Sequence, residues 1–523
     1  MSHEGHLMDR RTFITSSLIA GAGFALAAST GKITCAGMPS GQDLADLPLM
    51  ELSGLIRRGD LSSQGLLEAY FKRIDRYGGK EGINAYITLA KESAMAQASE
   101  LDRMAKEKRF RGPLHGLPIA VKDNLDTKNI RTTGGSAILA EWRPMRDANV
   151  IRKLREAGAI IVGKTNMHEF AFGITTNNTH YGPTRNPYDT SRIPGGSSGG
   201  SAAATAAALC AGAIGTDTGG SVRIPAALCG VVGLKPTLGR VGRSGLMYLS
   251  FTRDVIGPIT RTVGDSALML GAISGPDPGD PEGSATDADD YMKYIGKGIK
   301  GRIFGIPNKL FLENIHPDTE KVMNESIRAV KDLGGIVKDV EVKHMDIATP
   351  TGFNIVLAEC IYLIEDYLKG FDSEASIEKY AEKFGADVRP PIVGSKEKPV
   401  PGYVYARSVR RDRNLMIHGF EQAMSGVDAL LMPTTPLPAA KIGEDLKTEL
   451  LGKEVDTFLT FIRNCDPVSV VGYPAISVPA GYSNNGLPIG LQIVGRPWEE
   501  AKIIGMAHAF EQATKQRKAP KLD

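Results

Sequence analysis

The chain has 523 residues, of which 42 % are hydrophobic and 23 % charged, a composition typical of globular proteins. The length exceeds that of a typical single hydrophobic core, and the five scattered cysteines include no CxxC pair, which argues against a disulfide framework or a zinc site. The formal net charge of +3 is too small and too evenly mixed to favour nucleic acid or an anionic surface as a partner.

The N-terminus departs from this composition. Arg10 and Arg11 precede an apolar run of small residues at 14–28, and the sequence ALA at 25–27 offers a cleavage site. This pattern resembles a twin-arginine export signal, and the run is too short to span a bilayer comfortably as a permanent helix. We therefore expect residues 1–36 to be an export signal with its linker, a location in the bacterial periplasm, and no stable membrane insertion. An uncleaved leader is the alternative.

Helical and strand-like segments alternate over the first third of the chain. Residues 44–110 show helical spacing of their apolar side chains. An apolar strand then ends at Lys122, and a helix over 150–156 is followed by a strand over 159–162. Alternation of this kind indicates an α/β fold with stacked layers.

Two glycine-flanked serines form the most informative part of the chain. Ser197 lies in PGGSSGGS at 194–201, and Ser221 lies in GTDTGGSVR at 215–223. Glycines beside a hydroxyl allow unusual backbone angles and let another molecule approach the main chain. A serine is a weak nucleophile without a base, and Lys122, at the end of a buried strand, is the best candidate for that base.

These motifs resemble those of the amidase signature family of serine hydrolases, and the resemblance extends from about residue 44 to residue 496. It implies an α/β fold: a single large domain, 37–523, in which a mixed, twisted β-sheet is covered by helices on both faces. It also implies an enzyme with a Ser–cis-Ser–Lys triad. Ser221 would be the nucleophile, Ser197 the bridging serine after a cis peptide bond, and Lys122 the base.

The backbone around the nucleophile is expected to stabilise negative charge. The N–H groups of Thr218, Gly219, Gly220 and Ser221 would form an oxyanion hole, since successive amides beside two glycines can turn toward one oxygen. Donors of this kind are typically worth a few kcal/mol each.

Three further residues are expected to support the triad. Asp217 and Arg223 flank the nucleophile and would form an ion pair that braces the loop, while Ser198 would hydrogen-bond around the proton relay. No cofactor is expected. No metal site is expected either, because the nine histidines show no HExxH motif or paired spacing.

The proposed chemistry requires Lys122 to be neutral when substrate binds. A free lysine has a pKa near 10.4, and burial beside Ile119 and Val121 would lower it by several units at full burial. The neighbouring Asp123 would oppose that shift. Alternation along a strand, however, directs the two side chains to opposite faces.

Between residues 266 and 420 the sequence shows few motifs that resemble this family. We expect this stretch to form a divergent peripheral region and a lid that sets substrate preference. Within it, we predict a helix over 318–333 and loops at 275–283 and 390–391.

The resulting hypothesis is an amidohydrolase that cleaves the C–N bond of small carboxylic amides to an acid and ammonia or an amine, through an acyl-enzyme. Residues 219–258 resemble most the indoleacetamide and mandelamide hydrolases, which implies aryl or aliphatic primary amides. A peptide amidase, a carbamate or ester hydrolase, and a binding protein on an inactive scaffold are alternatives. So is the glutamine-hydrolysing subunit of a tRNA-dependent amidotransferase, although export argues against it because tRNA charging is cytosolic. We expect a small-molecule amide as the partner and no nucleic acid, and a homodimer stays open.

Overall fold

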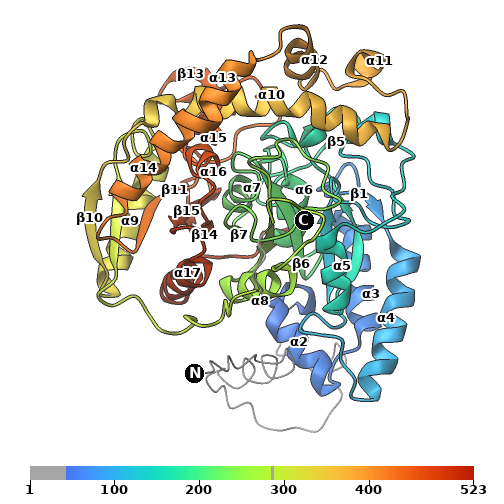
Figure 1. The fold of residues 1–523 in the computed structure, drawn as a ribbon. Coiled ribbons are helices and arrows are strands. Elements are labelled where there is room, and N and C mark those ends of the chain that lie inside the picture. Colours follow the sequence, from blue (N-terminus) through green and yellow to red (C-terminus); the bar gives the residue numbers. More distant parts are fainter. Residues whose placement is uncertain (1–42, 284–287, 523) are drawn as a thin grey trace, which may run out of the picture.

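Eleven strands pair into one mixed β-sheet in the computed structural model, which describes residues 43–283 and 288–522. The strand order is β1-β3-β2-β6-β8-β7-β14-β15-β11-β9-β10, and Figure 1 shows β1 and β10 toward opposite sides of the molecule. The predicted export signal, 1–36, lies outside the described residues.

The strands of this sheet and of two small hairpins have the following bounds. They are β1 Tyr86–Leu89, β2 Pro118–Lys122, β3 Ile160–Thr165, β4 Asn177–Asn178, β5 Gly182–Pro183, β6 Gly212–Asp217, β7 Val232–Lys235, β8 Val255–Thr260, β9 Ile303–Pro307, β10 Ile336–Val340, β11 Ala429–Pro433, β12 Lys447–Leu450, β13 Lys453–Asp456, β14 Ala475–Tyr482 and β15 Pro488–Val494. Strands β2, β3 and β6 run parallel, as do β9, β10 and β11, and antiparallel pairs join the two groups.

Helices surround the sheet. They are α2 Leu49–Arg58, α3 Ser63–Tyr77, α4 Lys91–Lys106, α5 Asn149–Glu156, α6 Gly199–Ala206, α7 Arg223–Leu228, α8 Val263–Ile273, α9 Pro317–Asp332, α10 Ala348–Lys369, α11 Ile377–Tyr380, α12 Arg389–Glu397, α13 Gly402–Arg407, α14 Arg413–Ala423, α15 Thr457–Ile462, α16 Asp466–Val470 and α17 Glu500–Thr514.

The side chains of β2 explain why helices cover both faces. Ile119 and Val121 belong to a buried cluster that includes residues of α2, α5, α8 and α17. Ala120, between them, belongs to a second cluster with residues of α3, α4 and α6. Because successive side chains of a strand point to opposite faces, these two clusters are the two layers on either side of the sheet. The predicted α/β fold class is confirmed.

Two local predictions need correction. The 44–110 stretch holds helices α2, α3 and α4, but also strand β1. Pro390 and Pro391 were expected in a loop, yet they lie in the first turn of α12, which begins at Arg389. Proline fits there because the first amides of a helix have no carbonyl partner within it.

Residues 266–420 contribute to the sheet as well as to its periphery. They supply β9 and β10 at one edge of the sheet, and α10, which runs along the top of the domain in Figure 1. In the described part of the chain, one helical stretch, Met345–Lys369, is long and apolar enough to cross a membrane by length and composition alone. Four of its side chains, Val356, Cys360, Ile364 and Leu368, are buried in a cluster against other parts of the domain.

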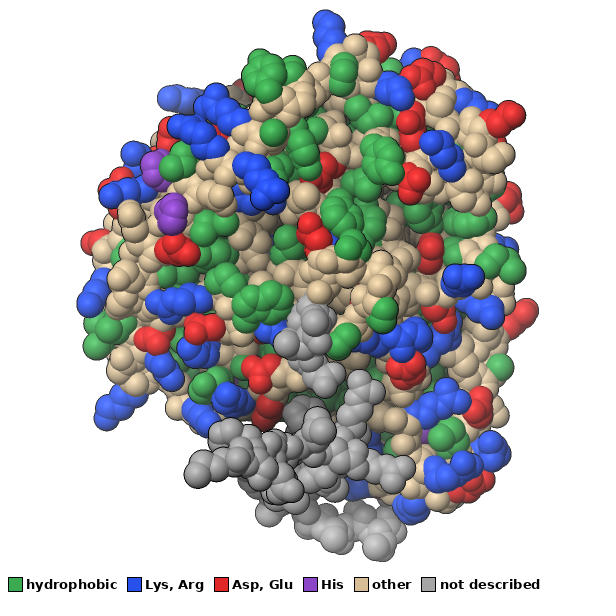
Figure 2. All heavy atoms as spheres, viewed as in Figure 1, with side chains coloured by type: hydrophobic (Ala, Val, Ile, Leu, Met, Phe, Trp, Pro, Cys, Tyr) green, Lys and Arg blue, Asp and Glu red, His purple; other side chains and the backbone are tan. Residues whose placement is uncertain are grey.

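Charges of both signs share the surface. On the face shown in Figure 2, basic and acidic side chains are interspersed among the described residues. Exposed ion pairs also occur in the described part of the chain, such as Arg152 with Glu156 at 2.6 Å. This distribution agrees with the small net charge of +3.

Candidate active site

The end of β2 places Lys122 against the glycine–serine loop that precedes α6. Its Nζ lies 2.7 Å from Ser197 Oγ and 2.7 Å from Thr216 Oγ1, and the side chain is fully buried. The Gly196–Ser197 peptide bond is cis, as the resemblance implies. The structure therefore brings together the residues predicted to be the base and the bridging serine.

The surroundings of Lys122 favour its neutral form. Burial lowers the pKa of Lys122 to about 7, although the Asp254 and Asp217 carboxylates act in the opposite direction. Asp123 bonds elsewhere, since its carboxylate accepts a hydrogen bond from the backbone N–H of Thr133 at 2.9 Å. A substantial fraction of the amine is therefore unprotonated at neutral pH.

Ser221 lies on a tight loop between β6 and α7. Gly220 has a φ of +134°, and a Cβ at this position would lie 2.6 Å from the nearest side-chain atom, so the loop requires glycine. The Asp217 carboxylate accepts hydrogen bonds from the backbone N–H groups of Gly220 (2.8 Å) and Val222 (3.1 Å), on either side of Ser221. Asp217 also forms the predicted ion pair with Arg223, at 2.9 Å with both side chains fully buried. Burial alone would raise the pKa of Asp217, but the Arg223 guanidinium holds it well below its usual range.

The buried pair leads to a stability prediction. Asp217→Asn should lower the free energy of unfolding by about 3–5 kcal/mol, because it leaves the Arg223 guanidinium without a counter-charge in a buried site. Denaturant unfolding followed by circular dichroism measures this effect. Glu156→Gln, which breaks the exposed pair with Arg152, is the matched control and should change stability little. Equal effects of the two variants would contradict the bracing role of Asp217.

One of the four amides predicted as oxyanion donors already has a hydrogen-bond partner. The Gly220 N–H points to Asp217 Oδ1, so this amide is already engaged. Within residues 43–283 and 288–522, the N–H groups of Thr218, Gly219 and Ser221 donate no hydrogen bond. Of the four amides predicted as oxyanion donors, these three are therefore without a hydrogen-bond partner among the described residues.

Thr216 links the parts of the site, and sequence reasoning missed it. Its Oγ1 contacts Lys122 Nζ and accepts a hydrogen bond from Asn124 Nδ2 at 3.1 Å. Ser198 Oγ, predicted to support the relay, donates to the carbonyl of Thr216 at 3.1 Å. The backbone N–H of Ser198 donates to the carbonyl of Ser221 at 3.3 Å. Thr216 and Ser198 thus connect the lysine to both serine loops.

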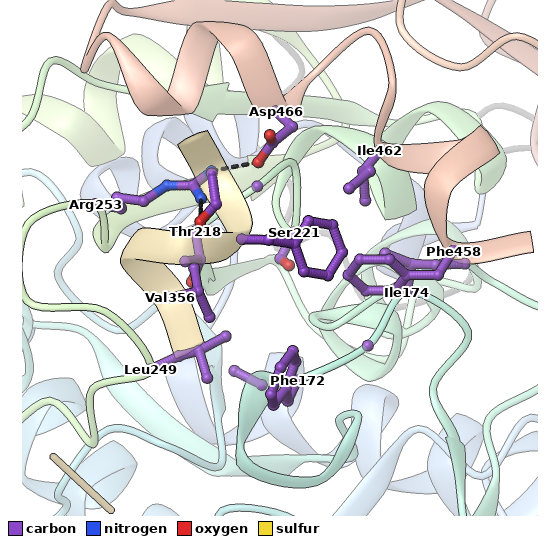
Figure 3. A pocket seen from close by; sticks show the side chains of 15 residues that line it. Phe172, Ile174, Thr218, Ser221, Leu249, Arg253, Val356, Phe458, Ile462 and Asp466 are labelled. Atoms are coloured by element: carbon purple, nitrogen blue, oxygen red, sulfur yellow. Dashed lines mark hydrogen bonds and ion pairs between the residues drawn. The ribbon is translucent and has the colours of Figure 1, made fainter. Parts of the chain in front are cut away.

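Ser221 lies at the wall of a pocket (Figure 3). The pocket is lined by Ala171, Phe172, Gly173, Ile174, Thr218, Gly219, Ser221, Leu249, Arg253, Gly352, Phe353, Val356, Phe458, Ile462 and Asp466. Most of these side chains are apolar, and the rings of Phe353 and Phe458 meet edge to face with their centroids 5.8 Å apart. Such a wall suits an apolar or aromatic group.

Arg253 and Asp466 are the charged side chains of this lining, and no sequence motif links them. Their side chains are 2 % and 8 % exposed and form an ion pair. Burial raises the pKa of Asp466, while the Arg253 guanidinium acts to lower it. Over the described part of the chain, no group of three or more His, Cys, Asp or Glu side chains is arranged to hold a metal ion.

Known proteins similar to this chain include components of an amidotransferase. A glutamyl-tRNA(Gln) amidotransferase subunit from Carboxydothermus hydrogenoformans is 40 % identical over 493 residues, which cover 92 % of this chain and 100 % of the relative. The protein of the same name from Thermotoga maritima has a solved structure that matches with a TM-score of 0.75 at 31 % identity, covering 92 % of this chain and 99 % of that one.

These relatives overturn the prediction of export to the periplasm. They are named for a reaction on glutamyl-tRNA, and tRNA charging is cytosolic. The twin-arginine interpretation rested on a short pattern at Arg10 and Arg11, outside the described residues, whereas the similarity extends over nearly the whole chain. Because the prediction of export is wrong, it no longer argues against a glutamine-hydrolysing subunit.

Other comparisons agree on the family. Native peptide amidase from Stenotrophomonas maltophilia matches with a TM-score of 0.79 at 32 % identity, covering 91 % of this chain and 98 % of that one. The family model described as Amidase matches residues 65–504. The chain therefore belongs to the amidase family and is an enzyme that hydrolyses amide C–N bonds.

Proposed function

We propose that this enzyme hydrolyses carboxylic amides through an acyl-enzyme on Ser221. The observation that carries the proposal is the hydrogen bond of 2.7 Å between Lys122 Nζ and Ser197 Oγ in a fully buried setting. Ser221, whose loop is joined to that of Ser197 through Ser198, lies at the wall of the pocket. A base, a relay and a nucleophile are thus available beside a cavity for substrate.

The first half-reaction forms the acyl-enzyme. Ser221 Oγ bonds to the amide carbon and passes its proton to Ser197 Oγ, whose own proton goes to the neutral amine of Lys122. The carbonyl electrons collect on the oxygen, which accepts hydrogen bonds from the amides of Thr218, Gly219 and Ser221. The C–N bond then breaks, and the leaving nitrogen takes the proton back through Ser197.

The second half-reaction releases the acid. A water molecule attacks the ester carbon of acyl-Ser221, and its proton follows the same path to Lys122. The bond to Ser221 Oγ breaks as this oxygen recovers a proton, which leaves the free acid and the starting enzyme. Each oxyanion donor is worth about 2.7–4 kcal/mol in comparable sites.

The pocket favours a small amide with an apolar acyl group. Its apolar side chains would exclude water around an alkyl or aryl substituent, and three of them are phenylalanines. Glutamine is the second candidate substrate, favoured by the 40 % identity to a glutamyl-tRNA(Gln) amidotransferase subunit. In that case the chain would act with partner subunits on a tRNA-linked substrate.

A substrate panel tests these two candidates. We expect the purified chain alone to release ammonia from benzamide and butanamide at least about tenfold more efficiently, in kcat/KM, than from glutamine, because glutamine brings two charges to a mostly apolar pocket. Ammonia release over time measures this ratio. Glutamine hydrolysis that exceeds benzamide hydrolysis, or that appears only with co-purified partner subunits, would favour the amidotransferase role instead.

A further inference from the structure

The two charged side chains that line the pocket are bonded to each other. Arg253 and Asp466 form their ion pair on one wall of the pocket (Figure 3). Arg253 Nη1 also donates to the carbonyl of Gly352 at 2.9 Å. Every other lining residue is uncharged. The pocket therefore offers a bound molecule no unpaired charge.

Close packing holds the pair in place between the nucleophile loop and α10. A Cβ on Gly219 would lie 3.1 Å from Asp466 Oδ1, and a Cβ on Gly352 would lie 2.6 Å from Asp466 Oδ2 and 3.0 Å from Arg253 Nη1. The pair thus lies against the backbone of Gly219, one of the proposed oxyanion donors, on one side and against Gly352 of α10 on the other. A charged acyl group would meet it close to the reacting carbonyl.

We propose that the Arg253–Asp466 ion pair is a specificity determinant that selects substrates whose acyl group carries no charge. This inference rests on the proposed function, in which Ser221 accepts the acyl group. A carboxylate or ammonium on the substrate would either remain unpaired in a desolvated pocket or have to separate the pair, and both are unfavourable.

Neutralising one member of the pair should turn the other into a binding group. When residue 466 is neutral, the guanidinium of Arg253 keeps its hydrogen bond to Gly352, and its positive charge is no longer compensated and can attract a carboxylate. The Nε of Arg253 has no hydrogen-bond partner among the described residues, so the arginine retains unused donors. Without Arg253, the Asp466 carboxylate is free for an ammonium group.

Three amides with four carbon atoms each test this selection against charge: neutral butanamide, anionic succinamate and cationic 4-aminobutanamide. In the wild type, kcat/KM for butanamide should exceed that for either charged amide by at least about 100-fold. Asp466→Asn should improve succinamate relative to butanamide by at least about tenfold, and Arg253→Gln should do so for 4-aminobutanamide. The two variants should thus shift the preference in opposite directions, which general loss of structure would not produce.

Arg253→Lys is the matched control, because it preserves an ion pair and should preserve the wild-type ranking of the three amides. The inference is overturned if Asp466→Asn and Arg253→Gln both keep the wild-type ranking of the three amides. It is also overturned if the wild type hydrolyses glutamine best and either substitution raises the KM for glutamine. If a variant does not fold, the inhibition constants of the three amides are measured on the wild type instead. Equal constants for the neutral and the charged amides would overturn the proposed selection against charge. Similar hydrolysis of all three amides by the wild type would contradict only the proposed selection against charge. No hydrolysis of any amide would contradict the proposed function.

Discussion

Replacing Ser221 with alanine should abolish amide hydrolysis and leave the fold intact. The lost hydroxyl is the group that we propose bonds to the acyl carbon, and removing the nucleophile of a serine triad lowers turnover by about 10⁴-fold or more. Ser221 lines the pocket, and alanine fits in its space, so the melting temperature should stay close to that of the wild type. Ammonia release and thermal unfolding measure the two effects.

A serine-directed fluorophosphonate gives an independent readout of the same residue. It should label the wild type at Ser221, as identified by peptide mass spectrometry, and should not label Ser221→Ala. Ser201→Ala is a matched control, because Ser201 lies in the neighbouring α6 and its Oγ bonds to Thr165 and to the carbonyl of Ile214, away from the pocket. This control should still be labelled. Labelling of another serine, or substantial hydrolysis by Ser221→Ala, would assign the nucleophile elsewhere.

The residues of the proposed triad could be found from sequence because their setting is local. Ser197 and Ser221 carry glycines beside them, and Gly220 indeed adopts a φ that favours glycine. Lys122 ends a strand whose residues are all buried, and an unbroken apolar run is the signature of such a strand. The alternation of β2 side chains between two helical layers follows from the same periodicity.

The pocket could not be found in this way because distant segments build it. Phe353 comes from α10 and Asp466 from α16, both more than 100 residues after Ser221, and nothing near either residue marks it as facing the site. The hydrogen bond that engages the Gly220 amide could not be predicted from the sequence for a similar reason. The Gly220 amide is engaged because the Asp217 side chain turns toward it, and sequence spacing does not determine that orientation.

The pH dependence of hydrolysis should follow the amine of Lys122. Burial lowers the pKa of Lys122 to about 7, against the opposing effects of Asp254 and Asp217. A protonated amine cannot accept a proton through Ser197, so kcat/KM should fall about tenfold for each pH unit below 7 and level off above it. Lys122→Met should lower kcat/KM at pH 8 by about 10²–10⁴-fold and remove this profile. A profile that is flat from pH 6 to pH 8 in the wild type would contradict the assignment of the base.

The same shift in pKa predicts an effect on stability. The pKa of Lys122 is about 7 in the folded chain, against 10.5 for an unperturbed lysine. Between these values the unfolded chain binds more protons than the folded one, so this lysine makes the free energy of unfolding increase with pH. Lys122→Met removes that contribution. Its stability relative to the wild type should therefore be highest below pH 7 and decline by roughly 3–5 kcal/mol toward pH 10.5.

Lys235 supplies the control that separates the catalytic effect from the effect on stability. It is fully buried at the end of β7, outside the pocket, and its Nζ donates to the carbonyls of Pro236 (3.0 Å) and Tyr473 (2.8 Å). Burial also lowers the pKa of Lys235 to about 7. Lys235→Met should therefore change stability with pH in the same direction as Lys122→Met, yet keep the wild-type pH profile of hydrolysis. If Lys235→Met removed that profile and Lys122→Met kept it, Lys122 would not be the base, because both amines are buried but one alone contacts Ser197.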